Sequence, residues 1–435
     1  MSNQFSRRDF IKLIGAGAAS ATFSGCATTP ATPITPDAPT KPIGRVIVIG
    51  GGFGGATAAR YIRMWSEGRI EVLLIERETQ FVSCPLSNLV VGGSLEIADI
   101  TLGYDKLRDQ SVHVIRDEVT GIDVAKKRIQ LKRVADLQYD RLVVAPGVDF
   151  IYESIAGLEK PEAQKTVLHA WKAGPETVAL RRQLEEMADG GVYVLSIPRA
   201  PFRCPPGPYE RACQVANYFK QAKPKSKVVV LDANEDIISK KGLFFTAWNE
   251  LYKGIIDYQP NQEAREVDYA TKTLKTDFDS FNGDVLNVIP PMRAGLIAAH
   301  AKLITANNRW CGVDWLTMES VAAPGVHVLG DATLSAPAMP KSASMANDHA
   351  KICASAIVAM MTGKPVNDSP VIVNACYSYL SPTEVAHVTS VHRYDPAQKT
   401  LVTVQGSGGL SARRNETEKP FADAWARNIW ADTLG

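Results

Sequence analysis

Short runs of β-branched and apolar residues recur along the chain, and stretches of helical character follow them. Four runs are continuous enough to predict buried parallel strands, at residues 45–49, 71–75, 192–197 and 227–231. Helical patterns are found at residues 56–60, 176–187, 209–220 and 343–360. Strands that alternate with helices predict an α/β fold, and the strand–turn–strand plan occurs twice. We therefore expect two Rossmann-like, three-layer domains of the dinucleotide-binding type.

The first strand runs directly into a glycine-rich turn. Gly50, Gly52 and Gly55 fit the pattern G-x-G-x-x-G, in which the glycines allow a tight turn, close approach of a pyrophosphate and helix–strand packing. Glu76, followed by Arg77, ends the second strand roughly 20 residues after the last glycine, where an acid accepts hydrogen bonds from an adenosine ribose. Strand, glycines, helix, strand and acid in this order predict a dinucleotide site.

A second element decides which dinucleotide binds. A strand-like segment far along the chain ends in Gly330 and Asp331. In flavoproteins with two dinucleotide domains, a similar aspartate hydrogen-bonds the ribityl and pyrophosphate part of FAD. The strand and turn that include Ala145 and Gly147 resemble those that close the FAD domain in the same proteins. We expect FAD as the cofactor; the alternative is that Asp331 only caps the following segment.

The equivalent turn of the second half has lost its glycines. Residues 198–210 read Pro-Arg-Ala-Pro-Phe-Arg-Cys-Pro-Pro-Gly-Pro-Tyr-Glu. Proline has no N–H to donate to a pyrophosphate. The sequence therefore argues against NAD(P)H as electron donor or acceptor, and electrons must arrive and leave by other means.

Composition and charge narrow the class of partner. The 435 residues are 45% hydrophobic and 22% charged, as in a folded protein with a large core, and the formal net charge is +2. That balance gives no electrostatic reason to expect nucleic acid as a partner. Cys-x-x-Cys, Cys-x-x-Cys-His and His-Glu-x-x-His patterns do not occur in the sequence, so we expect neither a metal site nor an attached haem.

The first 43 residues have the features of an export segment. Arg7 and Arg8 precede an uncharged stretch too short to span a membrane, which predicts a twin-arginine (Tat) signal peptide over residues 1–25 and a periplasmic location. Cys26 follows a sequence similar to a lipid-attachment signal, so one interpretation is a lipid tether at Cys26, and the other is a soluble protein cleaved nearby. Prolines recur every third residue in the linker 26–43, which predicts a polyproline II spacer.

Several blocks of sequence together suggest a family. They include the glycine turn at 48–59, Cys84-Pro-Leu-Ser-Asn88, residues 169–174, the block Ala200-Pro-Phe-Arg-Cys-Pro-Pro-Gly-Pro-Tyr-Glu-Arg-Ala212, residues 288–291 and 339–342, Asn374-Ala-Cys-Tyr-Ser378 and residues 431–435. On these stretches the chain resembles the flavoprotein subunit of flavocytochrome c sulfide dehydrogenase, within the pyridine nucleotide-disulfide oxidoreductase-like superfamily. The resemblance covers about residues 44–435.

The resemblance implies a redox-active disulfide over the flavin, and the matching cysteines are Cys204 and Cys376. An exported chain meets an oxidising compartment in which disulfides persist, and such a bond can be attacked by a soft anion such as hydrosulfide. One cysteine then carries a persulfide, and the other is a thiolate that can pass two electrons to FAD. The alternatives are a plain stabilising disulfide and two separate buried thiols.

Further residues receive roles from their positions. Cys84 matches the place where some family members attach the flavin through a thioether, although it could also be a small residue against the flavin ring. Glu210 could take a proton from H2S or could be a first-turn helix acid. Lys341 precedes a helix whose N–H groups could face the flavin. Trp171, Tyr377 and Tyr379 could line the sulfide pocket, but most of them are expected to be packing residues. Cys213, Cys311 and Cys353 are expected to remain thiols, the first and last of them buried.

The expected organisation has five parts: a signal peptide at 1–25, a linker at 26–43, a discontinuous FAD-binding domain at 44–160 and 296–362, a second Rossmann-like domain without an NAD motif at 161–295, and a C-terminal interface domain at 363–435. We expect a sulfide–cytochrome c reductase that oxidises sulfide and delivers electrons to a separate c-type cytochrome subunit. The alternatives are a sulfide:quinone oxidoreductase and a non-enzymatic accessory flavoprotein that reactivates a sulfur-oxidising partner.

Overall fold

The run of β-branched residues after Gly44 forms the centre of a five-stranded parallel sheet. In the computed structural model, which describes residues 42–435, the strand order is β19-β9-β1-β2-β5. Val46, Ile47 and Val48 are fully buried, because both faces of the sheet are covered. The strands are β1 (Gly44–Ile49), β2 (Ile70–Glu76), β5 (His113–Arg116), β9 (Arg141–Val144) and β19 (Val326–Val328). The predicted signal peptide, Cys26 and nearly all of the proline spacer lie outside the described residues.

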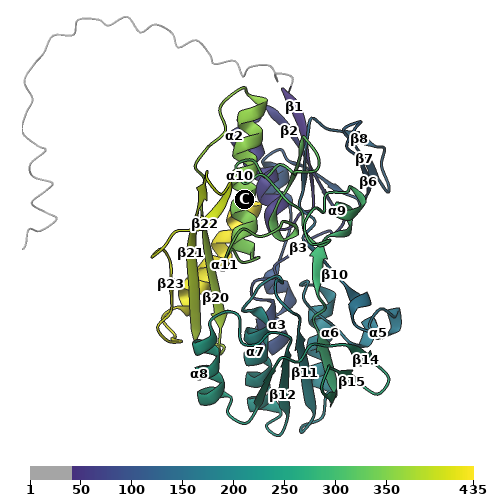
Figure 1. Cartoon of the computed structure of the whole chain (residues 1–435), viewed down its shortest axis with the longest axis vertical. Coiled ribbons are helices and arrows are strands. Elements are labelled where there is room, and N and C mark those ends of the chain that lie inside the picture. Colours follow the sequence, from purple (N-terminus) through teal and green to yellow (C-terminus); the bar gives the residue numbers. More distant parts are fainter. Residues whose placement is uncertain (1–41) are drawn as a thin grey trace, which may run out of the picture. The chain divides into compact units, whose positions relative to one another are not determined.

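Two helices and a small sheet accompany this parallel sheet. Helices α2 (Phe53–Trp65) and α10 (Ala343–Met361) pack against each other (Figure 1). Helix α2 extends beyond the predicted pattern at both ends, and α10 is one residue longer than its pattern. Small residues of α2 allow close contact: a Cβ at Gly54 would lie 2.3 Å from the Leu329 side chain after β19 and 3.5 Å from the carbonyl oxygen of Ala346 on α10. The antiparallel sheet consists of β6 (Val119–Asp123), β7 (Arg128–Leu131) and β8 (Leu137–Gln138).

The second half repeats the plan with a four-stranded parallel sheet in the order β13-β12-β11-β17. The predicted strand at 192–197 is β11, and the second predicted strand extends one residue further as β12. The helices of this half are α6 (Pro175–Glu186), α7 (Gly207–Ala222) and α8 (Lys241–Leu251). The strands of both of its sheets are β11 (Val192–Ile197), β12 (Lys227–Asp232), β13 (Ile256–Pro260), β17 (Val285–Val288), β14 (Glu266–Asp268), β15 (Thr273–Lys275) and β16 (Ser280–Asn282).

The chain passes between the two halves through a short antiparallel pair, β10 (Val148–Phe150) with β18 (Met292–Ala294). Because β19 lies after the second half in sequence but pairs with β9, the first sheet is built from segments on both sides of that half. The α/β architecture with two Rossmann-like sheets is confirmed. The exact domain boundaries remain an interpretation, since residues 41–435 form one continuous unit.

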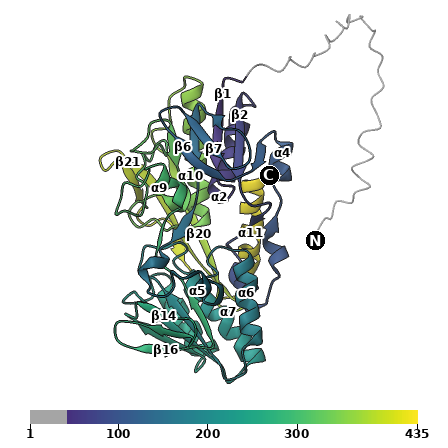
Figure 2. The same cartoon turned by 90° about the vertical axis from the view of Figure 1, so that its right-hand side faces the viewer.

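The C-terminal region adds a further antiparallel sheet that contacts both halves. Its strands are β20 (Val371–Tyr379), β21 (Val385–Asp395), β22 (Thr400–Thr403) and β23 (Gly409–Leu410). Strand β20 contacts α10 of the first half and α7 of the second, so its residues lie where the two halves meet. Helix α11 (Lys419–Leu434) contacts α2, α10 and β20, and Figure 2 shows it from the side.

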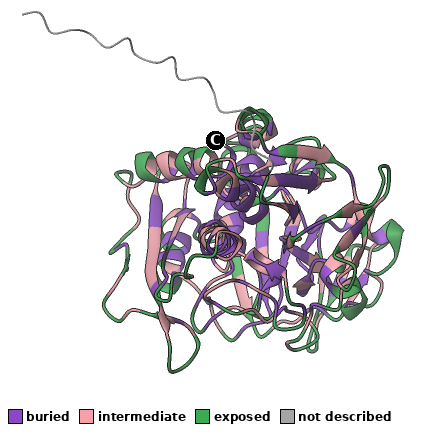
Figure 3. Cartoon of the chain, turned by 90° about the horizontal axis from the view of Figure 1, so that it is seen from above, coloured by how far each residue is buried: buried purple, intermediate pink, exposed green. Residues whose placement is uncertain are grey.

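Short elements complete the described part of the chain: β3 (Phe81–Val82), α3 (Ser87–Gly92), η1 (Ile97–Ile100), β4 (Thr101–Leu102), α4 (Asp105–Asp109), η2 (Tyr152–Ser154), α5 (Pro161–Thr166), α9 (Leu296–His300) and η3 (Gly330–Ala332). Buried residues concentrate on the sheets and on the helices between them (Figure 3). Within residues 42–435, none of the helices combines the length and the apolar character that a membrane crossing requires.

Candidate active site

The glycine turn after β1 has the geometry that a dinucleotide pyrophosphate needs. Gly50 has a φ of +98°, and a Cβ on Gly55 would lie 1.8 Å from the carbonyl oxygen of Gly50, so the first and third glycines are required by the turn itself. A Cβ on Gly52 would meet no atom within 4 Å. This position is therefore open, and a ligand can approach the start of α2 closely.

The acid at the end of β2 faces this turn. Glu76 accepts hydrogen bonds from the backbone N–H of Gly51 and, at 2.9 Å, from that of Glu78. Tyr104 donates from its hydroxyl to the Gly51 carbonyl oxygen at 3.1 Å. Arg77, the other residue predicted here to bind the cofactor, is exposed and pairs with Glu78. The carboxylate of Glu76 therefore faces the glycine turn, while Arg77 is directed toward solvent.

The other predicted FAD contacts surround the same edge of the sheet. Ala145 donates from its N–H to the Ile49 carbonyl oxygen at 2.8 Å, and Gly147 has a φ of +64° with open space beside it. Gly330, at a φ of +71°, begins η3, which carries Asp331. Burial raises the pKa of the Asp331 carboxyl group. The glycine cradle, the acid and these turns fit FAD.

The ammonium group of Lys341, which we predicted to lie near the flavin, is bonded to other groups of the protein. Its ammonium group donates to the carbonyl oxygens of Asp331 and Thr333 and lies 3.8 Å from the centroid of the Trp310 indole ring. Burial lowers its pKa to about 8. Its backbone oxygen accepts from the N–H of Cys204 at 2.8 Å. Lys341 therefore positions η3 and the Cys204 turn.

Cys204 lies in the turn between β11 and α7. Its backbone has a φ of +59°, a left-handed conformation that is unfavourable for a residue with a Cβ and is frequent at functional sites. The Cys204 sulfur and the indole ring of Trp171 both pack against Gly207. A Cβ on Gly207 would lie 2.8 Å from the sulfur and 2.8 Å from the indole ring. Trp171 donates from Nε1 to the carbonyl oxygen of Arg203 at 3.1 Å, so this aromatic ring is packing that also fixes the turn.

Glu210, in the first turn of α7, connects three elements of the site. One carboxylate oxygen accepts from the N–H of Tyr379 on β20 at 2.8 Å, and the other accepts from the side-chain amide of Asn88 on α3 at 3.0 Å. Burial raises its pKa, although these two hydrogen bonds oppose the rise. Its charge affects the pKa values of both Cys204 and Cys376.

Cys376 lies in the middle of β20, opposite Val388 of β21. The hydrogen bond from the Tyr379 N–H on β20 to Glu210 of α7 brings the strand of Cys376 to the helix that follows Cys204. Burial raises the pKa of Cys204, and a charge on Cys376 raises it further. Both are free thiols in the structure, as is Cys84. A bond between Cys204 and Cys376 therefore stays a prediction, as does attachment of the flavin to Cys84.

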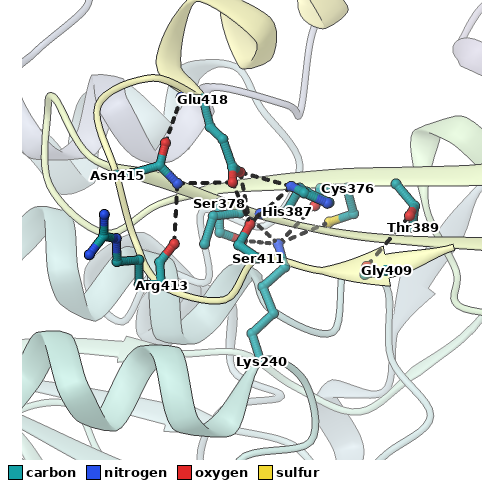
Figure 4. Close-up of polar contacts among 11 residues, drawn as sticks. Lys240, Cys376, Ser378, His387, Thr389, Gly409, Ser411, Arg413, Asn415 and Glu418 are labelled. Atoms are coloured by element: carbon teal, nitrogen blue, oxygen red, sulfur yellow. Dashed lines mark hydrogen bonds and ion pairs between the residues drawn. The ribbon is translucent and has the colours of Figure 1, made fainter.

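Two basic residues that the sequence patterns did not single out belong to this site. Burial disfavours the charge of the Arg203 guanidinium, but Cys84, Asp331 and Cys204 around it raise its pKa above the ordinary value. Lys240, buried beside Cys376, is the second (Figure 4). Arg203 lies next to Cys204 in the distinctive sequence block, so the sequence could have indicated it. Lys240 is separated from Cys376 by more than a hundred residues, and no sequence pattern indicated it.

The remaining cysteines and aromatic residues are structural. Cys213, Cys311 and Cys353 are fully buried thiols, as expected for Cys213 and Cys353 from their helical patterns. Tyr379 is buried and donates from its hydroxyl to Asp423, while Tyr377 packs near His387 and Trp425. Among the described residues there is no group of three or more His, Cys, Asp or Glu side chains placed to hold a metal ion.

Comparison with known proteins places this site in a family. Residues 177–290 match the central domain of the sulfide dehydrogenase (flavocytochrome c) flavoprotein chain, residues 368–434 match the flavocytochrome c sulphide dehydrogenase flavin-binding domain, and residues 44–185 match the pyridine nucleotide-disulphide oxidoreductase domain.

Individual relatives agree with these matches. The chain is 54% identical over 46 residues to the sulfide dehydrogenase (flavocytochrome c) flavoprotein chain of Chlorobaculum thiosulfatiphilum, covering 11% of this chain and 94% of that sequence. It is 20% identical over 342 residues to the mitochondrial sulfide:quinone oxidoreductase of Dictyostelium discoideum, covering 75% and 73%. The solved sulfide:quinone oxidoreductase of Aquifex aeolicus superposes with a TM-score of 0.71 at 17% identity, over 89% of this chain and 91% of that one, which shows a shared fold. The chain belongs to the flavocytochrome c sulfide dehydrogenase flavoprotein family and is a flavin-dependent oxidoreductase.

Proposed function

We propose that this chain is the flavoprotein subunit of a periplasmic sulfide dehydrogenase that delivers electrons to a c-type cytochrome. The observation that carries the proposal is the convergence of Cys204 and Cys376 around Glu210. The carboxylate bonds the strand that bears one cysteine and lies on the helix that follows the other. Two cysteines placed together beside an FAD motif are suited to two-electron chemistry on a soft sulfur anion.

The proposed reaction begins at an oxidised Cys204–Cys376 pair. Hydrosulfide attacks one of the two sulfurs, a bond forms between the incoming sulfur and that cysteine, and the bond between the cysteines breaks. The electron pair of the broken bond remains on the other cysteine as a thiolate. FAD, when bound, supplies a two-electron acceptor that can release its electrons one at a time. Glu210, with its raised pKa, is placed to accept the proton if H2S rather than hydrosulfide enters.

The cofactor can be held by the residues at the carboxyl edge of the first sheet. The glycine turn and Glu76 suit the adenosine and pyrophosphate part, and Gly330 and Asp331 suit the ribityl part. We propose that Cys84 forms a thioether to the flavin. Cys84 and Asp331 both raise the pKa of Arg203, which supports a position for Cys84 beside the residues that suit the flavin.

The sequence of the second Rossmann-like half favours a cytochrome over NAD(P)H as the electron acceptor. The turn after β11, where a nicotinamide dinucleotide would place its pyrophosphate, contains four prolines and carries Cys204 instead. We therefore propose that NAD(P)H takes no part. The electrons must then leave to an acceptor outside the chain, and we propose that this acceptor is a haem in a separate cytochrome subunit.

A sulfide titration of the flavin-loaded protein without oxygen tests the proposal. We expect loss of the oxidised flavin absorbance on adding sulfide, and reduction of the haem when the cognate cytochrome is added. A flavin that stays oxidised would refute sulfide as the substrate. A flavin that is reduced but passes electrons to a quinone analogue and not to the cytochrome would favour the second candidate, a sulfide:quinone oxidoreductase, which the relatives of that name make the specific alternative.

The location is proposed from the N-terminal sequence alone. Arg7 and Arg8 in a twin-arginine context support export of the folded, cofactor-loaded chain to the periplasm. We propose in addition that Cys26 carries a lipid and that the proline-rich linker separates the enzyme from the membrane. Cell fractionation with mass spectrometry of the N-terminal peptide tests both, since a processed chain that begins at an unmodified residue after Cys26 excludes the tether.

A further inference from the structure

The ammonium group of Lys240 is buried against the sulfur of Cys376. Nζ lies 3.9 Å from the Cys376 sulfur and donates to the Cys376 carbonyl oxygen at 2.9 Å, to the Ser378 hydroxyl at 2.9 Å and to the Ala386 carbonyl oxygen at 3.3 Å. Lys240 is only 5% exposed. Figure 4 shows the Lys240 side chain extending toward Cys376 and Ser378 of β20 from the position just before α8.

Local physical chemistry disfavours a lysine at this place. Lys240 immediately precedes α8, where the helix dipole repels a cation, and its φ of +57° is a left-handed conformation that costs energy for a residue with a Cβ. Burial of an ammonium group adds a desolvation cost. Three unfavourable features at one residue indicate that the position serves the neighbouring chemistry.

Lys240 has no carboxylate as an ion-pair partner among the described residues. Its neighbours in the contacts above are neutral oxygens. Of the groups that face Cys376 from other elements, Glu210 on α7 raises its pKa, and Lys240 opposes both that effect and burial. His387, on the paired strand β21, shares its Nδ1 with Glu418 and Ser411 instead.

We propose, on the basis of the function proposed above, that Lys240 is a catalytic residue that stabilises Cys376 as the leaving thiolate, so that hydrosulfide attacks Cys204. A thiolate leaves faster from a disulfide when a nearby cation stabilises it. The bond between the hydrosulfide sulfur and Cys204 forms while the Cys204–Cys376 bond breaks, and the electron pair stays on Cys376 as the anion that pairs with Lys240. The hydrosulfide proton remains on the terminal sulfur of the Cys204 persulfide.

The first test measures the thiol reactivity of the two cysteines without sulfide. The flavin-loaded protein is reduced with a water-soluble phosphine and alkylated with iodoacetamide over a range of pH, and the peptides of Cys376 and Cys204 are quantified by mass spectrometry. We expect the alkylation of Cys376 to reach half its maximal rate at a lower pH than that of Cys204. In Lys240→Met the Cys376 profile should move up by about one pH unit or more, a tenfold loss of thiolate at a given lower pH.

Two further variants separate charge from structure. Lys240→Arg keeps the cation and should retain most of the wild-type difference, while Lys241→Met removes the adjacent exposed lysine, which pairs with Asp236, and should change neither profile. An unchanged Cys376 profile in folded, flavin-containing Lys240→Met overturns the proposal. If that variant does not fold, the wild-type profiles decide: Cys376 titrating below Cys204 supports the proposal, and Cys204 titrating at or below Cys376 overturns it.

The second test locates the persulfide. Oxidised wild-type protein is exposed briefly to sulfide and trapped with iodoacetamide, and the extra sulfur atom is assigned to a peptide by mass spectrometry. A persulfide on Cys204 supports the proposal, and one on Cys376 overturns it. The two proposals fail in different ways: if sulfide does not react with the protein at all, the sulfide dehydrogenase function fails, while the alkylation profiles still report whether Lys240 activates Cys376.

Discussion

The backbone N–H of Cys204 donates a hydrogen bond to the carbonyl oxygen of Lys341 at 2.8 Å, which joins the turn before α7 to the segment before α10. The same segment also holds the strand of the second cysteine. Ser342 caps α10 and donates to the Asn374 side chain at 2.9 Å, and Ser344 donates to the Val373 carbonyl oxygen at 3.0 Å. The positions of both sulfurs are therefore set against one short stretch of chain, although one cysteine lies in the turn after β11 and the other on β20.

Serine in place of either reactive cysteine should abolish sulfide-driven reduction of the flavin. Serine cannot form the bond that hydrosulfide opens, so Cys204→Ser and Cys376→Ser should each lower the rate of flavin reduction by at least about a hundredfold while the flavin stays bound. Rapid-mixing absorbance measurements without oxygen give this rate. Cys353→Ala, at a fully buried thiol of α10, is the control and should keep its activity. Wild-type rates in either serine variant would contradict the proposed mechanism.

Local patterns were sufficient to predict the parallel strands and the glycine turn. The run at 192–197 became β11 without change, because a continuous apolar stretch between polar ends is a local property of the sequence. The helix expected from 209 begins earlier, at Gly207, since Pro208 is favourable in a first helical turn. The conformations of Cys204 and Lys240, both at positive φ, could not be predicted, because they are imposed by tertiary contacts.

Some residues of the candidate site could be selected from the sequence, and others could be found only in the structure. Cys204 and Glu210 stand in one distinctive block and could be selected from sequence. The partners of Glu210 could not, because Asn88 and Tyr379 come from a helix and a strand on either side of it in the chain. For Lys341 the sequence placed the residue near the site, but only the structure shows that its ammonium group is bonded to Asp331 and Thr333.

Substitution of Cys84 should release the flavin from covalent attachment. If Cys84 forms a thioether, acid precipitation of the wild-type protein should leave the flavin with the pellet, whereas Cys84→Ser should release it to the supernatant. Absorbance of the two fractions and the mass of the Cys84 peptide measure this. Cys311→Ser, at a buried thiol elsewhere in the chain, should leave the distribution unchanged. Release of all flavin from the wild-type protein would refute the thioether.

Two glycines of the first turn should respond differently to alanine. At Gly55 a Cβ would lie 1.8 Å from backbone, so Gly55→Ala should destabilise the fold by about 1–3 kcal/mol or more and reduce flavin content. At Gly52 the Cβ meets no protein atom, so Gly52→Ala should change stability by less than about 0.5 kcal/mol but still lower the flavin content, because the methyl group occupies the approach of the pyrophosphate. Denaturation and flavin-to-protein ratios compare them. Full flavin loading of Gly52→Ala would place the pyrophosphate elsewhere.

The buried carboxyl group of Glu210 should make stability depend on pH. Its pKa in the folded protein is raised, mainly by burial, above the ordinary value of 4.5. The protonated group is thus favoured by folding, so its contribution to stability is complete below the unfolded pKa and is lost as the pH rises through the folded pKa. The free energy of unfolding of the wild type, relative to Glu210→Gln, should therefore fall from about pH 4 toward neutrality.

Urea denaturation at a series of pH values measures this difference, and Glu186→Gln, at an exposed position of α6, is the control for net charge. A difference that grows with pH would mean that the hydrogen bonds from Tyr379 and Asn88 outweigh burial, and Glu210 would then have a lowered pKa and be a weak proton acceptor for the sulfide reaction.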